Sequence, residues 1–139
     1  MEKIESIQRQ IIEEFEMFEN WIHKYEYIIE LGKELPEIEQ EYKVDENLIP
    51  GCQSRVWLYA KKKGGKVVFF ADSDAIMTKG IIALLIRVFS GQNPSDITAS
   101  KLDFIDIIGL KDQLSVTRAN GLSSMIKQMK IYALAFNAK

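Results

Sequence analysis

The sequence predicts a single α+β domain in which a small antiparallel sheet packs on helices. Helical patterns occupy the first 35 residues, two β-rich segments follow within residues 55–71, and helical patterns then resume. This order differs from the alternation of strand and helix that produces a parallel sheet. A length of 139 residues is also typical of one domain. We therefore expect residues 1–139 to form one domain without internal repeats.

Two amphipathic helices are predicted at the start of the chain. Isoleucine and phenylalanine recur at steps of three and four within residues 2–18, which places them on one helix face. A second helix is expected from Trp21 to Leu35, with Asn20 as its N-cap and Pro36 as its stop. Its apolar side is expected to contain Ile22, Tyr25, Ile28, Ile29 and Gly32.

A β-hairpin is predicted after an acidic connector. The connector, residues 37–47, contains one short extended candidate, Glu41 to Val44. Residues 55–59 and 66–71 are rich in Val, Trp, Tyr and Phe, and a Lys-Lys-Gly-Gly sequence lies between them. β-Branched and aromatic runs joined by glycines are typical of a hairpin.

A buried central helix is expected from about Ala75 to Phe89. The segment is apolar on almost every side, and the preceding Asp72-Ser-Asp74 offers N-cap oxygens. Gly80 lowers the helix propensity by about 1 kcal/mol relative to Ala, so we expect it to permit the close approach of another backbone.

Further helices are predicted in the C-terminal third. A short helix is expected to begin at Asn93-Pro94, because Pro suits the first helical position, and another is expected at residues 102–108 before Gly109. The last helix is expected to begin near Thr117.

The charge is unevenly distributed along the chain. Residues 1–50 carry a net charge of −9 and residues 51–139 a net charge of +7, within a total of −2. The near-neutral total argues against a general nucleic-acid binder, whereas two oppositely charged sides would orient a protein partner.

The sequence also argues against a membrane protein. Its longest apolar run, Ile81 to Ile86, is far shorter than the roughly 18 residues that suggest a membrane span. The acidic N-terminal segment does not have the pattern of a secretory signal. We therefore expect a cytoplasmic protein.

Cys52 is the only cysteine in the sequence. A lone cysteine is often an inert, buried residue. Cys52, however, follows Pro50-Gly51 in a turn before a strand, and reactive groups are often found on such loops. Gly51 would allow a tight turn, and Arg55 would favour the thiolate if its side chain turned back. The residues alone leave the inert and the reactive interpretations open.

Four segments of the chain resemble the SufE family of sulfur-acceptor proteins. They are Tyr27-Ile-Ile-Glu-Leu-Gly-Lys-Glu-Leu-Pro36, Pro50-Gly-Cys-Gln-Ser-Arg-Val-Trp-Leu58, Asp72-Ser-Asp-Ala with Lys79-Gly-Ile-Ile-Ala-Leu-Leu85, and Thr117-Arg-Ala-Asn-Gly-Leu122. They follow the family's order and spacing, and the resemblance covers about residues 10–135. It implies a compact α+β fold similar to the iron–sulfur scaffold protein IscU, with Cys52 on a loop at one end.

The resemblance further implies that Cys52 accepts sulfur and becomes a transient persulfide. In this family a pyridoxal-phosphate-dependent cysteine desulfurase supplies the sulfur, and a cluster-assembly scaffold receives it. We therefore expect a SufS-like desulfurase and a SufBCD-like scaffold as partners. The protein would need no cofactor of its own. It would act, as a monomer or weak homodimer, as a carrier and activator rather than as a stand-alone enzyme.

Six further residues are expected to support the cysteine loop or to bind the partner: Gly51, Gln53, Ser54, Arg55, Asp74 and Arg118. Asp74 is expected to cap the central helix, and a contact with the desulfurase is the alternative. Arg118 opposes the macrodipole in the first turn of its helix, so we expect it to face the Cys52 loop or the partner. Gln113 and Val116 replace the His and Pro that are common in the family, which leaves any role of that His open.

Other functions remain open at this stage. A cysteine-dependent hydrolase or thiol oxidoreductase would use Cys52 as its nucleophile, with His23 as the only imidazole in the sequence. A cluster scaffold would need Cys52 residues from two chains to hold iron and sulfur. A non-catalytic adaptor would contain an inert Cys52.

Overall fold

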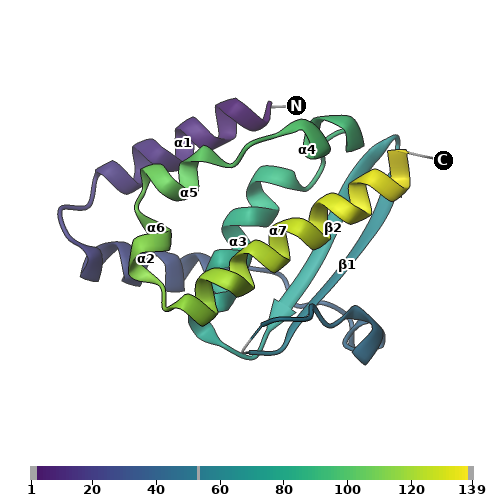
Figure 1. Cartoon of the computed structure of the whole chain (residues 1–139), viewed down its shortest axis with the longest axis horizontal. Coiled ribbons are helices and arrows are strands. Elements are labelled where there is room, and N and C mark those ends of the chain that lie inside the picture. The colour runs from purple at the N-terminus through teal and green to yellow at the C-terminus, as the bar shows by residue number, and fades with distance from the viewer. Residues whose placement is uncertain (1–2, 53, 138–139) are drawn as a thin grey trace.

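The computed structural model describes residues 3–52 and 54–137. Within these residues, helices pack against one face of a two-stranded antiparallel sheet, which confirms the α+β class (Figure 1). The elements follow one another as α1 (Ile4–Glu16), α2 (Trp21–Lys33), η1 (Gln40–Tyr42), η2 (Asp45–Asn47), β1 (Val56–Lys63), β2 (Lys66–Ser73), α3 (Ile76–Phe89), α4 (Pro94–Ala99), α5 (Asp103–Ile107), α6 (Leu110–Gln113) and α7 (Val116–Asn137).

The two N-terminal helices form where the periodicity predicts them. The side chain of Asn20 accepts a hydrogen bond from the backbone N–H of His23, so Asn20 is the N-cap of α2. The predicted apolar side of α2 is too wide, because Ile22 is 70% exposed and Tyr25 is 40% exposed. Only a narrow part of α2 touches α3, and it is centred on Ile28 and the glycine one turn further along the helix.

The acidic connector contains 3₁₀ turns in place of the extended segment expected at Glu41 to Val44. The ring of Tyr42 stacks on that of Tyr59 in β1, with 4.2 Å between the ring centroids. This contact places the connector over the outer face of the hairpin. The aromatic stacking therefore determines the local conformation, and the β-propensity of the segment does not.

The hairpin is the only sheet among the described residues. Its strands pair from Val56 opposite Ser73 to Lys63 opposite Lys66. Gly64 and Gly65 form the turn with φ values of 56° and 80°, which suit the right-handed twist of a two-residue hairpin loop. Alternate residues of β1 are buried, so the hairpin packs one face toward α3.

Helix α3 is the buried central helix that the sequence predicts. It packs against both α2 and β2 (Figure 1). The expected close approach at Gly80 is confirmed, because a β-carbon on Gly80 would overlap the carbonyl group of Ile28. A β-carbon on Gly32 would likewise lie 2.7 Å from the backbone nitrogen of Gly80. The two glycines therefore allow the backbones of α2 and α3 to touch.

The C-terminal helices cover the remaining side of the core. Pro94 begins α4 as predicted, and Gly109, with a φ of 79°, separates α5 from α6, a short helix that the sequence pattern does not predict. Helix α7 runs diagonally across the molecule and reaches the hairpin at its C-terminal end (Figure 1). Among the residues described, no helix has the length and apolar character needed to cross a membrane.

Candidate functional site

Cys52 is on the loop before β1, and its side chain lies beside the N-terminal parts of α3 and α7. It borders a cavity of about 20 Å³, which has room for about one water molecule. The residues that line this cavity are Cys52, Ser54, Thr78, Ile81, Thr117, Arg118, Gly121 and Met125. The structure thus places the predicted residues Ser54 and Arg118 beside Cys52.

The thiol of Cys52 is half-buried and donates a hydrogen bond to the carbonyl oxygen of Gly121, with 3.7 Å between sulfur and oxygen. Burial raises the pKa of this thiol. A donated hydrogen bond also requires the protonated form. Cys52 is therefore held as a thiol in this conformation. Burial sets the direction of its pKa shift, and the lowering expected from Arg55 is not found.

Gly51 gives the loop the turn that the sequence predicts. Its φ of +84° lies in the left-handed region, which other residues seldom adopt. A β-carbon at this position would also lie 3.1 Å from the hydroxyl oxygen of Ser124 in α7. Gly51 therefore lets the loop pass close to α7 and bring Cys52 to Gly121.

Asp74 binds the loop and does not cap α3. Its carboxylate accepts a hydrogen bond from the backbone N–H of Arg55 at 3.1 Å, and its own N–H donates to the Arg55 carbonyl at 3.3 Å. The predicted cap is wrong because the chain stays extended through Ala75, which occupies the N-cap position of α3 without a side-chain cap. Asp74 therefore lies one residue too early for this role. Its contact fixes the chain three residues after Cys52.

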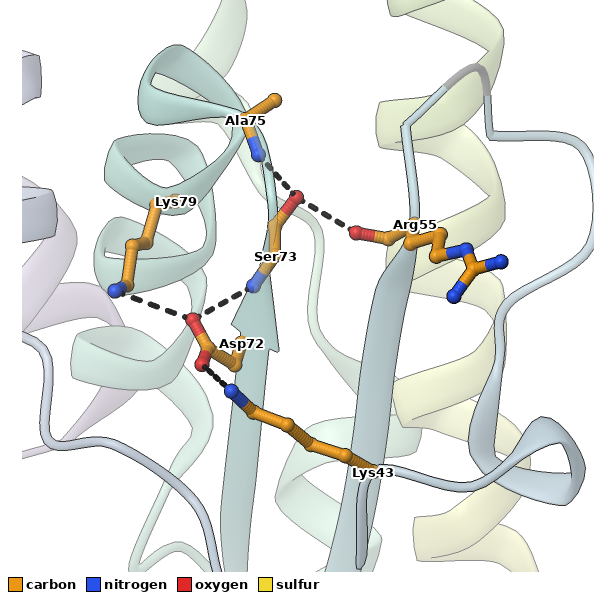
Figure 2. Close-up of polar contacts among 6 residues, drawn as sticks. All are labelled: Lys43, Arg55, Asp72, Ser73, Ala75 and Lys79. Atoms are coloured by element: carbon orange, nitrogen blue, oxygen red, sulfur yellow. Dashed lines mark hydrogen bonds and ion pairs between the residues drawn. The ribbon is translucent and has the colours of Figure 1, made fainter. Parts of the chain in front are cut away.

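Asp72 and Ser73 form a buried polar cluster beside this loop (Figure 2), and neither residue is among the predicted site residues. The Asp72 carboxylate pairs with Lys43 at 3.0 Å and with Lys79 at 3.3 Å. Burial opposes its ionisation, but hydrogen bonds from Lys43, the Ser73 N–H and Lys79 outweigh burial and lower the pKa of Asp72. The sequence shows the Asp-Ser-Asp block, but it does not show that Lys43 and Lys79 pair with Asp72.

The remaining candidates lie apart from the thiol or outside the described residues. Gln53 falls outside the part of the chain that the structure describes. Gln113 ends α6 and Val116 begins α7, and neither lines the Cys52 cavity. His23 is exposed on α2 and borders a different hollow, beside Phe18. Within residues 3–52 and 54–137, no three His, Cys, Asp or Glu side chains are grouped as a metal site.

Comparison with other proteins identifies relatives over most of the chain. A family model described as SufE, an Fe-S metabolism associated domain, matches residues 9–133. An uncharacterized SufE-like protein of Rhizobium meliloti (strain 1021) is 41% identical over 128 residues, which cover 87% of this chain and 90% of that protein. SufE-like protein 1 of Arabidopsis thaliana, described as chloroplastic/mitochondrial, is 36% identical over 132 residues, which cover 94% of this chain and 36% of that protein.

A solved structure shares the fold. The solution structure of a hypothetical protein from Thermus thermophilus superimposes with a TM-score of 0.79. The match covers 96% of this chain and 97% of the Thermus chain at 18% sequence identity.

Proposed function

The chain belongs to the SufE family, and from this membership we propose that it transfers sulfur in iron–sulfur metabolism with Cys52 as the sulfur acceptor. The observation that carries the proposal is the position of the only cysteine. Cys52 is on a loop held by Gly51 and Asp74, next to a small cavity that Arg118 also lines. Reactive groups are often found on such loops, which a rigid scaffold positions.

The proposed reaction is a thiol exchange on a persulfide. The thiolate of Cys52 attacks the outer sulfur of a persulfide on the donor protein, and a new S–S bond forms at Cys52. The S–S bond of the donor breaks, and the donor cysteine leaves as a thiolate that takes up the proton lost by Cys52. One thiol and one persulfide are present before and after the step, so no external oxidant or reductant is needed.

The environment of Cys52 places a condition on this reaction. The thiol is half-buried, and the small hollow beside it gives the cysteine side chain of a donor protein little room to approach. The thiol is also protonated where it lies, because burial raises its pKa. We therefore expect Cys52 to move toward solvent when the donor binds, which would expose the sulfur further and favour the thiolate.

The proposed partners are a SufS-like cysteine desulfurase, which carries its own pyridoxal phosphate, and a SufBCD-like scaffold that receives the sulfur. The opposite charges of the two parts of the chain, −9 in residues 1–50 and +7 in residues 51–139, would orient such protein partners. The protein would thereby stimulate the desulfurase without being a stand-alone enzyme. The cytoplasmic location and the monomeric or weakly dimeric state stay predictions, which cell fractionation and light scattering would test.

Intact mass tests the proposal directly. The protein is mixed with a cysteine desulfurase and L-cysteine in the absence of reductant, and Cys52→Ser serves as the matched control. We expect a gain of about 32 Da that dithiothreitol reverses and that the variant does not show, as expected for a reversible modification of the thiol. No gain with several active desulfurases would overturn the proposal.

Two alternatives predict other outcomes. A hydrolase would need His23 near the thiol, but His23 does not line the Cys52 cavity. An adaptor with an inert cysteine would stimulate the desulfurase equally well as Cys52→Ser. Equal stimulation by the variant and the wild type would therefore favour the adaptor.

A further inference from the structure

The end of β2 carries two buried polar residues, Asp72 and Ser73, which bond to segments on both sides of the Cys52 cavity without lining it. We propose that Asp72 and Ser73 are positioning residues that hold the Cys52 loop, the connector and the first turn of α3 together, and so keep the thiol of Cys52 half-buried (Figure 2).

The hydroxyl group of Ser73 links the loop to the helix. Its O–H donates a hydrogen bond to the carbonyl oxygen of Arg55 at 2.8 Å, and its oxygen accepts one from the N–H of Ala75 at 3.2 Å. Arg55 follows Cys52 by three residues, so their Cα atoms are within about 11 Å of each other. One hydroxyl group therefore fixes both the end of the Cys52 loop and the start of α3.

The carboxylate of Asp72 adds the connector to the same cluster. Asp72 is 3% exposed, and its Oδ1 accepts from the Ser73 N–H at 2.8 Å while also pairing with Lys79. Its Oδ2 pairs with Lys43, whose ammonium group also lies 5.5 Å from the centroid of the Trp57 ring. A buried carboxylate is stable only when it is paired in this way.

These contacts reach two walls of the cavity. Lys79 follows Thr78, which lines the cavity from α3, and Arg55 follows Ser54, which lines it from the loop. Figure 2 shows Asp72 and Ser73 between these two elements. Removal of the Ser73 hydroxyl would therefore loosen both walls while leaving the residues that border the thiol in place.

Alkylation of Cys52 by iodoacetamide tests this role without any partner protein. We expect Ser73→Ala to react about five to ten times faster than the wild type, which corresponds to the loss of about one net hydrogen bond from the state in which the thiol is half-buried. The faster rate should change little with low concentrations of urea, because local opening exposes little surface. If Ser73→Ala only lowered the global stability of the fold, the alkylation rate would instead rise with urea as steeply as the population of the unfolded protein does.

Ser90→Ala is the matched control. The hydroxyl oxygen of Ser90 accepts a hydrogen bond from the N–H of Phe69 at 3.0 Å, so it also anchors β2, but away from the Cys52 loop. We expect its alkylation rate to equal that of the wild type. Ser73→Thr retains the hydroxyl group and should restore the slow rate.

A second variant keeps the test decisive if Ser73→Ala does not fold. Lys43→Gln removes one of the two cations that pair with Asp72. Because the side chain of Lys43 is partly exposed, we expect this variant to fold and its Cys52 to be alkylated faster than that of the wild type. Wild-type rates in both Ser73→Ala and Lys43→Gln would overturn the inference. The proposed sulfur transfer stands or falls separately, because it depends on the mass gain of the wild-type protein.

Discussion

The backbone of Gly80 in α3 lies against the carbonyl group of Ile28 in α2, leaving no space for a β-carbon between the two helices. Gly80 belongs to the same turn of α3 as Thr78 and Ile81, which line the Cys52 cavity. This crossing of α2 and α3 therefore fixes the helix on which one wall of the site depends.

Replacement of Gly80 by Ala should destabilise the fold strongly. Alanine would gain about 1 kcal/mol of helix propensity, but its methyl group would force the two backbones apart. We expect a net loss of more than about 2 kcal/mol in the free energy of unfolding, measured by urea denaturation. A variant as stable as the wild type would show that the helices can separate without cost.

The equivalent change at Gly121 should not destabilise the protein. A β-carbon there would lie 3.5 Å from the sulfur of Cys52 and 3.8 Å from its Cα, which are ordinary contact distances. Since Gly121 is inside α7, Gly121→Ala should preserve the free energy of unfolding or raise it by up to about 1 kcal/mol. The same denaturation experiment checks this, and a loss as large as that in Gly80→Ala would contradict it.

Tyr27 should make stability depend on pH in the alkaline range. Burial, together with a hydrogen bond to Glu14, raises the pKa of Tyr27 to about 12, compared with about 10 in the unfolded chain. The unfolded state therefore loses this proton first, and the contribution of Tyr27 is complete below about pH 10 and is lost as the pH rises toward 12.

Tyr27→Phe isolates this effect because the other tyrosines titrate in both proteins. We expect the stability difference between wild type and variant to shrink steadily in urea titrations carried out from pH 9 to higher pH. A difference that stays constant with pH would indicate that the Tyr27 hydroxyl contributes equally in both ionisation states.

Arg118 provides a test of the site that is separate from the fold. Its side chain is exposed and lines the Cys52 cavity at the start of α7, where a cation opposes the helix dipole. We expect Arg118→Ala to be as stable as the wild type but to accept sulfur more slowly in a time course of intact mass. Lys127→Ala removes an exposed cation from the same helix and should leave the rate unchanged. Equal rates for all three proteins would exclude a role for Arg118.

The elements that depend on local chemistry were predictable from the sequence. Asn20 occupies the N-cap of α2, Pro94 begins α4, and the Gly64-Gly65 pair forms the hairpin turn. Each of these residues acts through its own backbone preference or on a neighbour a few positions away. The turn that carries Cys52 was predictable for the same reason, since Gly51, which allows this turn, is the neighbouring residue.

The features that were missed depend on contacts between distant segments. Periodicity identifies the apolar side of α2 but not the narrow width of its contact with α3, so the predicted buried side wrongly includes Ile22, which is exposed. The stacking of Tyr42 on Tyr59 overrides the extended pattern of the connector. An Asp at position 74 is compatible with a helix cap and with a loop anchor. The choice depends on the residue at which α3 begins, and Ala75 occupies the N-cap position while Asp74 binds the loop.

The hydrogen bond between Cys52 and Gly121 joins residues that are 69 positions apart, which has a consequence for the newly made chain. The hairpin can close early because its strands are adjacent, whereas α7 begins only at Val116. At about 5–20 residues per second, synthesis delivers the start of α7 about 3–13 seconds after Cys52. We expect the sulfur to be uncovered during this interval, so oxidation is a greater hazard for the nascent chain than for the folded protein.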